Sequence, residues 1–289
     1  MLIFEKSLLI MYNYQKHKVN GDYMGKGKMI GRGNTAEVFL WGENNILKLF
    51  VKGFPIEAIK AEYEVSREVS SIGLPVPQAY QMIEVDGRMG IEYEKIDGTD
   101  MLKSISKKPW TAFGKGKRLA QLHYKIHQCT PKYAPDQKER MEWAIRRTDL
   151  LTDEQKNGVV EILKCMPGGS SLCHGDFHPG NVFLTSDKEV ILDWMTATCG
   201  NPAADVARTV IMLKDSVIPG KNPAILKTII SITRNKLYKG YIKEYLRLSE
   251  ITEKDIESWK VIIAGARLME WVPQEEKEYL LGVVLKVLE

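Results

Sequence analysis

The run Cys-His-Gly-Asp-Phe-His-Pro-Gly-Asn-Val at 173–182 restricts the fold of this chain more than any other segment. It places Asp176 and Asn181 five residues apart, on a tight loop between apolar segments. The short hydrophobic strand expected at 190–192 then ends in Asp193. Phosphoryl transfer uses such a set, because one carboxylate orients a hydroxyl group while an amide and a second carboxylate supply oxygen ligands for magnesium.

The same letters could mark an ordinary turn, since Pro179, Gly180 and Asn181 are all turn-forming residues. A turn does not explain why Asp176 and Asp193 both follow apolar runs. We therefore prefer the phosphoryl-transfer interpretation.

The spelling of the motif distinguishes between classes of kinase. Its H-x-D-x-x-x-x-N spacing is typical of a kinase catalytic loop. The sequence His174-Gly175-Asp176, with Trp194 after the later Asp, departs from protein kinases. It resembles the aminoglycoside phosphotransferase and choline kinase family, whose members phosphorylate hydroxyl groups of small molecules. The resemblance covers most of residues 28–270 and implies a two-lobe, protein-kinase-like fold with ATP or GTP as the phosphate donor.

The order of the expected elements gives an α+β fold class. Alternating hydrophobic runs punctuated by Gly and Asn predict antiparallel hairpins in the first part, together with one helix over 56–72. Gly73 is expected to end that helix. From Gly98 onward the pattern is mainly helical, with helices expected over 110–128, 136–150, 153–165, 203–214, 224–246, 252–270 and 279–288. We expect a small antiparallel β-sheet N-lobe over 1–97, in which 1–25 is an extra segment, and a larger helical C-lobe over 98–289.

The resemblance assigns a role to each polar residue of the motif. Asp176 is implied to be the catalytic base, which takes the proton of the acceptor hydroxyl. Asn181 and Asp193 are implied to hold Mg²⁺ together with the nucleotide phosphates. His178 stands where protein kinases carry a Lys, so it either donates to the γ-phosphate or fills a polar gap. His174 is more typical of a structural residue that pins the loop.

A lysine in the first lobe is expected to bind the nucleotide. Lys48 lies in the apolar strand Ile-Leu-Lys-Leu-Phe at 46–50. Alone, it would be assigned to the solvent face of an edge strand. With the motif downstream, it matches the strand Lys of the family, which holds the α- and β-phosphates. We choose Glu62 on the following helix as its acidic partner, while Glu64 and Glu68 stay open because one sequence does not fix the phase of a helix.

Two further segments are expected to contact the nucleotide. Gly31, Gly33 and Asn34 belong to a G-x-G-x-x-A sequence, whose glycines would let the backbone approach phosphates closely. A strand is predicted after them, which argues against a Rossmann loop, and the resemblance makes the segment a nucleotide-covering loop. In the hinge between the lobes, the resemblance implies that the Glu94 carbonyl and the Ile96 amide face the purine edge.

The acceptor-binding residues are less well defined. Candidates in the helical part are Asp149, Arg267, Glu270 and Trp271. A polycationic aminoglycoside would need a pocket crowded with carboxylates, but the helix surfaces are mixed in sign. A choline-type acceptor would need an aromatic cage, to which Trp194, Trp259 and Trp271 could contribute. An aminoglycoside, an amino alcohol such as choline and another small metabolite all stay open as acceptors.

Two other classes of function were weighed. A catalytically silent, nucleotide-binding pseudokinase is disfavoured, because Lys48, Asp176, Asn181 and Asp193 are all present. A protein kinase is disfavoured because no clear A-P-E element follows Asp193, and the next helix is expected near Ala203.

The composition limits the partners of the chain. Its 289 residues are 44% hydrophobic and 27% charged, as in ordinary soluble globular proteins. A net charge of +4 is too mild to imply nucleic-acid binding. We expect a nucleotide and a small hydroxyl-bearing acceptor as partners, no nucleic acid and no membrane, with the oligomeric state open. The four cysteines show no paired spacing and the N-terminus is a poor signal peptide, so we expect a cytoplasmic protein.

A pair of histidines needs separate consideration. His123 and His127 lie four residues apart on an expected helix, which is a spacing that can bind metal. The pair lacks the Glu of a zinc protease motif, so a structural role is favoured. Asp205 is expected either to brace the catalytic loop or to act as an acidic residue at a helix N-terminus.

Overall fold

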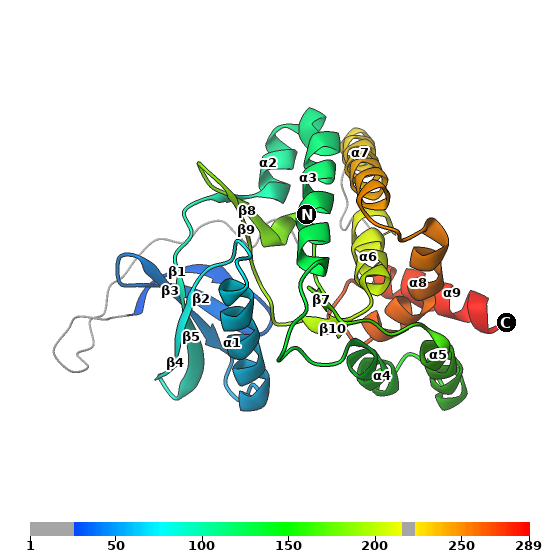
Figure 1. Cartoon of the computed structure of the whole chain (residues 1–289), viewed down its shortest axis with the longest axis horizontal. Helices are drawn as coiled ribbons and strands as arrows, with labels where there is room; N and C mark the ends of the chain where they lie inside the picture. The colour runs from blue at the N-terminus through cyan, green and yellow to red at the C-terminus, as the bar shows by residue number, and fades with distance from the viewer. Residues whose placement is uncertain (1–25, 216–222) are drawn as a thin grey trace. The chain divides into compact units, whose positions relative to one another are not determined.

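The structure, a computed structural model, describes residues 26–215 and 223–289. The extra segment expected at 1–25 lies outside the described residues. Contacts divide the chain into two compact units. The first runs up to Thr99 and also takes in Val182–Met195, and the second comprises Asp100–Asn181 and Thr196–Glu289. The expected α+β fold class is confirmed, since the first unit is built on an antiparallel sheet and the second is mainly helical (Figure 1).

The first unit contains a five-stranded sheet in which every pairing is antiparallel. Gly42 and Gly87, each with a positive φ, lie in the tight turns β2–β3 and β4–β5. The spatial order is β1-β2-β3-β5-β4, so the last two strands are added in reverse. The strands are β1 (Lys26–Arg32), β2 (Ala36–Trp41), β3 (Asn45–Phe50), β4 (Ala79–Val85) and β5 (Arg88–Glu94).

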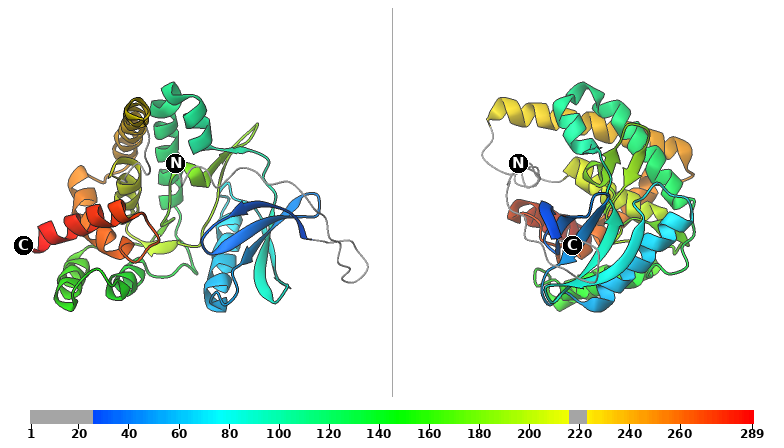
Figure 2. Two further views of the ribbon diagram at one scale, coloured as in Figure 1. Left: turned by 180° about the vertical axis from the view of Figure 1, so that it is seen from behind. Right: turned by 90° about the vertical axis from the view of Figure 1, so that its left-hand side faces the viewer.

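The two faces of this sheet bury different clusters. Leu47 and Leu49 of β3 pack on one face with Phe39 and Trp41. Because successive side chains of a strand alternate in direction, Phe50 faces the other side, where it packs with Ile59 of α1 (Ile56–Ser71). Helix α1 lies against β4 and β5 (Figure 2).

A later part of the chain returns to the first unit. β8 (Val182–Leu184) and β9 (Glu189–Ile191) form an antiparallel hairpin. The Ile191 amide donates a 2.7 Å hydrogen bond to the carbonyl of Pro75, and Met195 packs against the α1 face of the sheet. Our expected division into 1–97 and 98–289 assigned Val182–Met195 to the second lobe, whereas contacts group these residues with the first unit. The short strand β6 (Thr99–Asp100) stands where the chain leaves the first unit.

The second unit is mainly helical (Figure 1). Two short strands, β7 (Ser171–Cys173) and β10 (Thr198–Gly200), pair antiparallel on either side of the Asp176 loop, the name used below for residues 174–181. Short 3-10 turns cover Pro109–Thr111 and Pro179–Asn181, and a π-helical turn covers Ile211–Asp215. The helices are α2 (Met101–Lys107), α3 (Ala112–His127), α4 (Gln137–Arg147), α5 (Asp153–Cys165), α6 (Pro202–Val210), α7 (Ala224–Leu248), α8 (Glu253–Arg267) and α9 (Gln274–Leu288).

Helices α3 and α7 form the closest helix packing of the second unit (Figure 2). Two glycines permit it. A Cβ at Gly116 of α3 would collide with the backbone of Leu237, and a Cβ at Gly240 of α7 would collide with the backbone of Phe113. Within the described residues, no helix is both long and apolar enough to cross a membrane.

Candidate functional site

The first unit gathers three charged residues around Lys48. Strand β3 points this lysine to the α1 face, where its Nζ lies 2.7 Å from Glu62 Oε1 and 3.0 Å from Asp193 Oδ1. Glu62 is thus the glutamate of α1 that contacts Lys48. The Tyr93 hydroxyl of β5 donates to the same Glu62 oxygen at 3.0 Å. The lysine is therefore held from the helix and from the segment after β9, rather than at a solvent-facing edge.

The electrostatics of this cluster keep Lys48 charged. Burial alone would lower the pKa of Lys48, but Asp193 and Glu62 outweigh it, and the pKa lies above its ordinary value. The pKa of Glu62 is raised by burial despite its contact with Lys48. An ammonium group that contacts two carboxylates can bind a phosphate instead of one of them, if that carboxylate moves to bind another ligand, such as a metal ion.

Asp193 adopts an unusual backbone conformation. Its φ of +63° is left-handed, and among the described non-glycine residues only Asp86 shares this sign. Such a conformation costs about 1 kcal/mol or more for a residue with a side chain, and it is retained where neighbours fix it. The Lys48 contact and the buried β9 strand before it provide that constraint.

The other nucleotide-binding candidates also lie in the first unit. Gly31, one residue before the end of β1, lies opposite Val38 of β2. The Gly33 amide donates a 2.8 Å hydrogen bond to the Ala36 carbonyl that closes the turn in which Asn34 is exposed. Glu94 ends β5, where its amide donates to Gln78 at 2.9 Å. Ile96 follows β5 in the segment that leaves the sheet. Their contacts with a nucleotide stay predictions.

The second unit carries the other half of the motif. In the Asp176 loop, the Asn181 side chain donates from Nδ2 to the Asp176 carbonyl at 2.9 Å and to its Oδ2 at 3.3 Å. The ring of His178 lies 3.5 Å from the same carboxylate oxygen and accepts from the Gly180 amide at 3.0 Å. Gly175, with φ +75°, makes the reversal before Asp176. The loop thus brings Asp176, His178 and Asn181 together.

Asp205 of α6 fixes the start of this loop through hydrogen bonds to its backbone. Its carboxylate accepts the backbone amides of His174 at 2.6 Å and of Gly175 at 2.9 Å. Asp205 also accepts from His123 at 3.0 Å and His127 at 3.3 Å, both on α3. Both roles considered for Asp205 are observed, since it braces the loop and is also the acidic residue in the first turn of α6, which Asn201 caps.

The two histidines are enclosed in a polar layer. His123 and His127 hydrogen bond through Nδ1 to the hydroxyls of Tyr241 and Tyr245 on α7. Together with Asp205 they have ligand atoms close enough to hold a metal ion. Each ring nitrogen is already hydrogen bonded, and burial with the neighbouring His127 lowers the pKa of His123 to about 3. Hydrogen bonds that join the two histidines to Asp205 and to the two tyrosines account for the arrangement without a metal.

Arg208 is a site residue that the sequence interpretation missed. It lies one turn after Asp205 on α6, and its Nη2 is 3.4 Å from Asp176 Oδ1. Burial would raise the pKa of Asp176, but His178, Arg208 and His174 together hold it well below its usual range. The i, i+3 spacing from Asp205 was the available signal, because both side chains then lie on the same side of α6.

The acceptor candidates occupy different environments. Arg208 forms an ion pair with Glu270, which also accepts from Arg267 at 3.1 Å. Trp271, the next residue, is 91% exposed. Trp194 and Trp259 are buried, so the aromatic cage considered for a choline-type acceptor has only Trp271 exposed among its three tryptophans.

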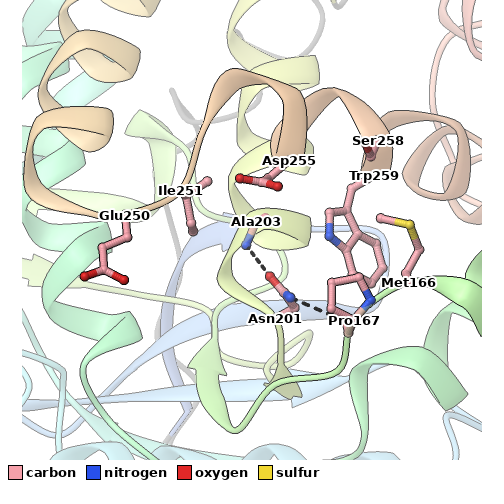
Figure 3. A pocket seen from close by; sticks show the side chains of 9 residues that line it. All are labelled: Met166, Pro167, Asn201, Ala203, Glu250, Ile251, Asp255, Ser258 and Trp259. Atoms are coloured by element: carbon pink, nitrogen blue, oxygen red, sulfur yellow. Dashed lines mark hydrogen bonds between the residues drawn. The ribbon is translucent and has the colours of Figure 1, made fainter.

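A pocket of about 330 Å³ lies elsewhere in the second unit. Trp259 forms one wall, and Asn201 hydrogen bonds across its floor to Ala203 and Pro167 (Figure 3). Of its two acidic residues, Asp255 accepts from Thr252, the N-cap of α8, in a capping box, and Glu250 is exposed. The pocket is lined by none of the residues predicted to catalyse the reaction or bind nucleotide.

The comparisons with known proteins agree with this geometry. The model of the phosphotransferase enzyme family (APH) matches residues 26–226, so the chain belongs to that family. No curated protein matches the sequence. The family resemblance inferred from the motif is therefore confirmed.

Solved structures show the same fold at low sequence identity. The amicoumacin kinase hAmiN, in complex with AMP-PNP, Ca²⁺ and its ligand Ami, is 15% identical with a TM-score of 0.59, over 91% of this chain and 87% of that one. An aminoglycoside phosphotransferase APH(4)-Ia mutant bound to AMP-PNP and hygromycin B is 13% identical with a TM-score of 0.61, over 92% and 93%. A choline/ethanolamine kinase family protein from Mesorhizobium loti is 15% identical with a TM-score of 0.52, over 92% and 87%.

Proposed function

We propose that this protein is a small-molecule kinase that transfers the γ-phosphoryl group of ATP or GTP to a hydroxyl of its acceptor. The observation that carries the proposal is the position of Lys48 between Glu62 and Asp193. A buried cation tied to the aspartate that ends the motif is suited to orient nucleotide phosphates. Family membership and the nucleotide-analogue complexes of similar structures support the same donor.

Asp176 is the proposed catalytic base. Its side chain is 30% exposed and its lowered pKa keeps it ionised at neutral pH, so it can accept a hydrogen bond from the acceptor hydroxyl. The hydroxyl oxygen attacks the γ-phosphorus, the bond to the bridging oxygen of the nucleotide breaks, and the hydroxyl proton passes to Asp176. His178, beside the same carboxylate, is the proposed donor to the transferred phosphoryl group.

Asn181 and Asp193 are the residues proposed to hold Mg²⁺. Amide and carboxylate oxygens are the ligands that this ion prefers. The Asn181 amide nitrogen is committed to Asp176, which leaves the Oδ1 oxygen for a cation. Once bound, Mg²⁺ supplies charge neutralisation for the phosphates.

The remaining nucleotide contacts are proposed for the first unit. Gly31, Gly33 and Asn34 would cover the phosphates with backbone amides. The carbonyl of Glu94 and the amide of Ile96 would pair with the purine edge. The acceptor is proposed to be a small hydroxyl compound. Aminoglycosides and choline-like amino alcohols belong to the first panel, because the similar structures include an aminoglycoside phosphotransferase in complex with streptomycin and ATP and a choline/ethanolamine kinase family protein. A cytoplasmic location fits such substrates.

Nucleotide consumption tests the proposal. The protein would be incubated with Mg²⁺ and ATP or GTP across aminoglycosides, amino alcohols, sugars and nucleosides, beside Asp176→Asn and the control Asp187→Asn, which changes an exposed carboxyl in the β8–β9 turn. We expect acceptor-dependent turnover that only Asp176→Asn abolishes. Nucleotide binding with no turnover in any condition would favour a pseudokinase, and a lack of nucleotide binding would refute the proposal.

A further inference from the structure

The charged groups beside Asp176 alternate in sign along a continuous chain of contacts. Asp176 is bound by Arg208, which forms an ion pair with Glu270. Glu270 is in turn bound by Arg267, whose Nη2 donates to Glu276 of α9 at 2.8 Å. This network, called the arginine–glutamate chain below, connects the proposed base to the last helix of the second unit.

Two carboxylates of this chain are accessible. The side chains of Asp176 and Glu270 are 30% and 33% exposed, while Arg208, Arg267 and Glu276 are largely enclosed. Both oxygens of Glu270 already accept from arginines, Oε1 from Arg208 and Oε2 from Arg267. Glu270 therefore has little negative charge left to offer to a ligand.

A further guanidinium group lies close to the same chain. Burial and the neighbouring Arg208 lower the pKa of Arg140 on α4, while Glu270 opposes the change. Arg140 thus lies near Arg208 and Glu270. With it, the chain of contacts from Asp176 to Glu276 holds three guanidinium groups and three carboxylates, so it is balanced in charge and not acidic.

The chain is also richer in donors than in acceptors. Among the described residues, the buried Nε of Arg208 and the buried Nη1 of Arg267 have no hydrogen-bond partner. Buried guanidinium nitrogens normally find an acceptor. These two nitrogens are enclosed, so a ligand beside Asp176 does not reach them directly. An oxygen atom there would add an acceptor to a chain rich in donors, whereas an ammonium group would add another donor and another positive charge.

We infer that the acceptor presents oxygen atoms, and no ammonium group, to the arginine–glutamate chain. The acceptor class is then a neutral polyol or a hydroxy acid, and not an aminoglycoside or an amino alcohol. This inference rests on the proposed kinase function. Recognition of a polycation requires carboxylates that are not already neutralised, and Glu270 is bound by two arginines.

Matched probes that differ in one group test the inference on the wild-type protein. D-Glucosamine and D-glucose share a skeleton but differ in an ammonium group, and D-gluconate and kanamycin extend the series in charge. Binding is measured by thermal shift and turnover by nucleotide consumption, both with Mg²⁺-ATP at constant ionic strength. We expect gluconate or glucose to bind at least tenfold more tightly than glucosamine or kanamycin.

Tighter binding of kanamycin or glucosamine overturns the inference, and so does a lack of binding by both oxygen-only probes. Failure of the proposed function is a different result, because it appears as a lack of Mg²⁺-ATP binding or of Asp176-dependent turnover. The comparison of acceptor affinities therefore tests the inference, whereas Mg²⁺-ATP binding and Asp176-dependent turnover test the proposed function.

A charge reversal tests the same idea from the protein side. Arg140→Glu moves the local balance by two charges toward the negative, so kanamycin binding should strengthen about tenfold and gluconate binding should weaken. Arg147→Glu makes the same change at an exposed position of α4 and should alter either affinity less than twofold. If Arg140→Glu does not fold, Arg140→Gln changes the local charge by one unit and should change both affinities in the same directions by a smaller factor. Equal effects of Arg140→Glu and Arg147→Glu would contradict the inference.

Discussion

The carboxylate of Asp205 lies 2.6 Å from the backbone nitrogen of His174 and fixes the start of the Asp176 loop. Its second oxygen takes the amide of the next residue. Both contacts go to backbone groups, so they position the proposed base whatever side chains the loop carries. The carboxylate is itself buried, and it accepts further hydrogen bonds from His123 and His127 of α3.

Replacement of Asp205 should therefore affect both stability and turnover. In Asp205→Asn, one of the two amides loses a charged acceptor, and we expect the free energy of unfolding to fall by about 2–4 kcal/mol. Urea unfolding measures the change. Thr209→Val removes the 2.9 Å bond to the Phe177 carbonyl in the same loop, together with the hydrogen bond between Thr209 and Tyr241, and should cost only about 1–2 kcal/mol. Equal losses in the two variants would show that Asp205 has no special role.

Replacement of Lys48 should weaken nucleotide use. Lys48→Met keeps the length of the side chain but removes the charge between Glu62 and Asp193. We expect kcat/KM for the nucleotide to fall on the order of 100-fold, because phosphoryl transfer depends on charge stabilisation. Steady-state kinetics measure this, with Lys52→Met at an exposed position as the control. A loss of less than threefold would argue against a phosphate-binding Lys48.

Acid should destabilise the protein through His123. Its pKa is about 3 in the fold, against an ordinary value of 6.5, so below pH 6.5 the unfolded chain binds a proton that the fold excludes. The free energy of unfolding should fall as the pH drops from 6.5 toward 3, by up to about 1.4 kcal/mol per pH unit for this group. Burial and the neighbouring His127 lower the pKa of His123, and they outweigh the contact with Asp205, which raises it. Urea unfolding between pH 7 and about 4.5 avoids most carboxyl titration.

The control for this effect is His123→Asn. The variant should be less stable at neutral pH, but its stability should fall less steeply with acid. An unchanged slope would assign the acid sensitivity to another group.

The contact between α3 and α7 can be tested with two glycines of one helix. Gly116→Ala places a methyl group against the backbone of Leu237, and we expect a loss of about 2–3 kcal/mol from overpacking. Gly114→Ala has open space around its Cβ and should stabilise α3 by about 0.5–1 kcal/mol. Thermal unfolding of both variants measures the difference. The packing argument would be refuted if the two variants changed the unfolding temperature by the same amount in the same direction.

The parts of the fold with strong local patterns could be predicted from the sequence. Helix α5 was expected at 153–165 and is found at Asp153–Cys165, where Thr152 forms a capping box. The helix after β3 was expected to end before Gly73, and a positive φ of +79° stops it there. Such signals lie within a few residues, so a single sequence contains them.

Features that depend on distant contacts were not accessible in the same way. Helix α9 begins at Gln274 and not at the expected Tyr279, because its polar first turn has no hydrophobic period while Glu276 is buried against Arg267. Helix α2 (Met101–Lys107) was not expected, since seven residues give little periodicity. Arg208 reached the site only through the packing of α6 against the Asp176 loop.

The return of Val182–Met195 to the first unit has a consequence for how the protein is made. A ribosome that has released only the first hundred residues has delivered Lys48 and Glu62 but not Asp193. The growing chain must then hold the α1 face of its sheet partly uncovered while about eighty more residues of the second unit emerge, a delay of several seconds at ordinary rates of synthesis. Met195, which follows the β8–β9 hairpin, packs against that face last, so a nascent chain stalled before residue 195 would present an unfinished first unit to chaperones.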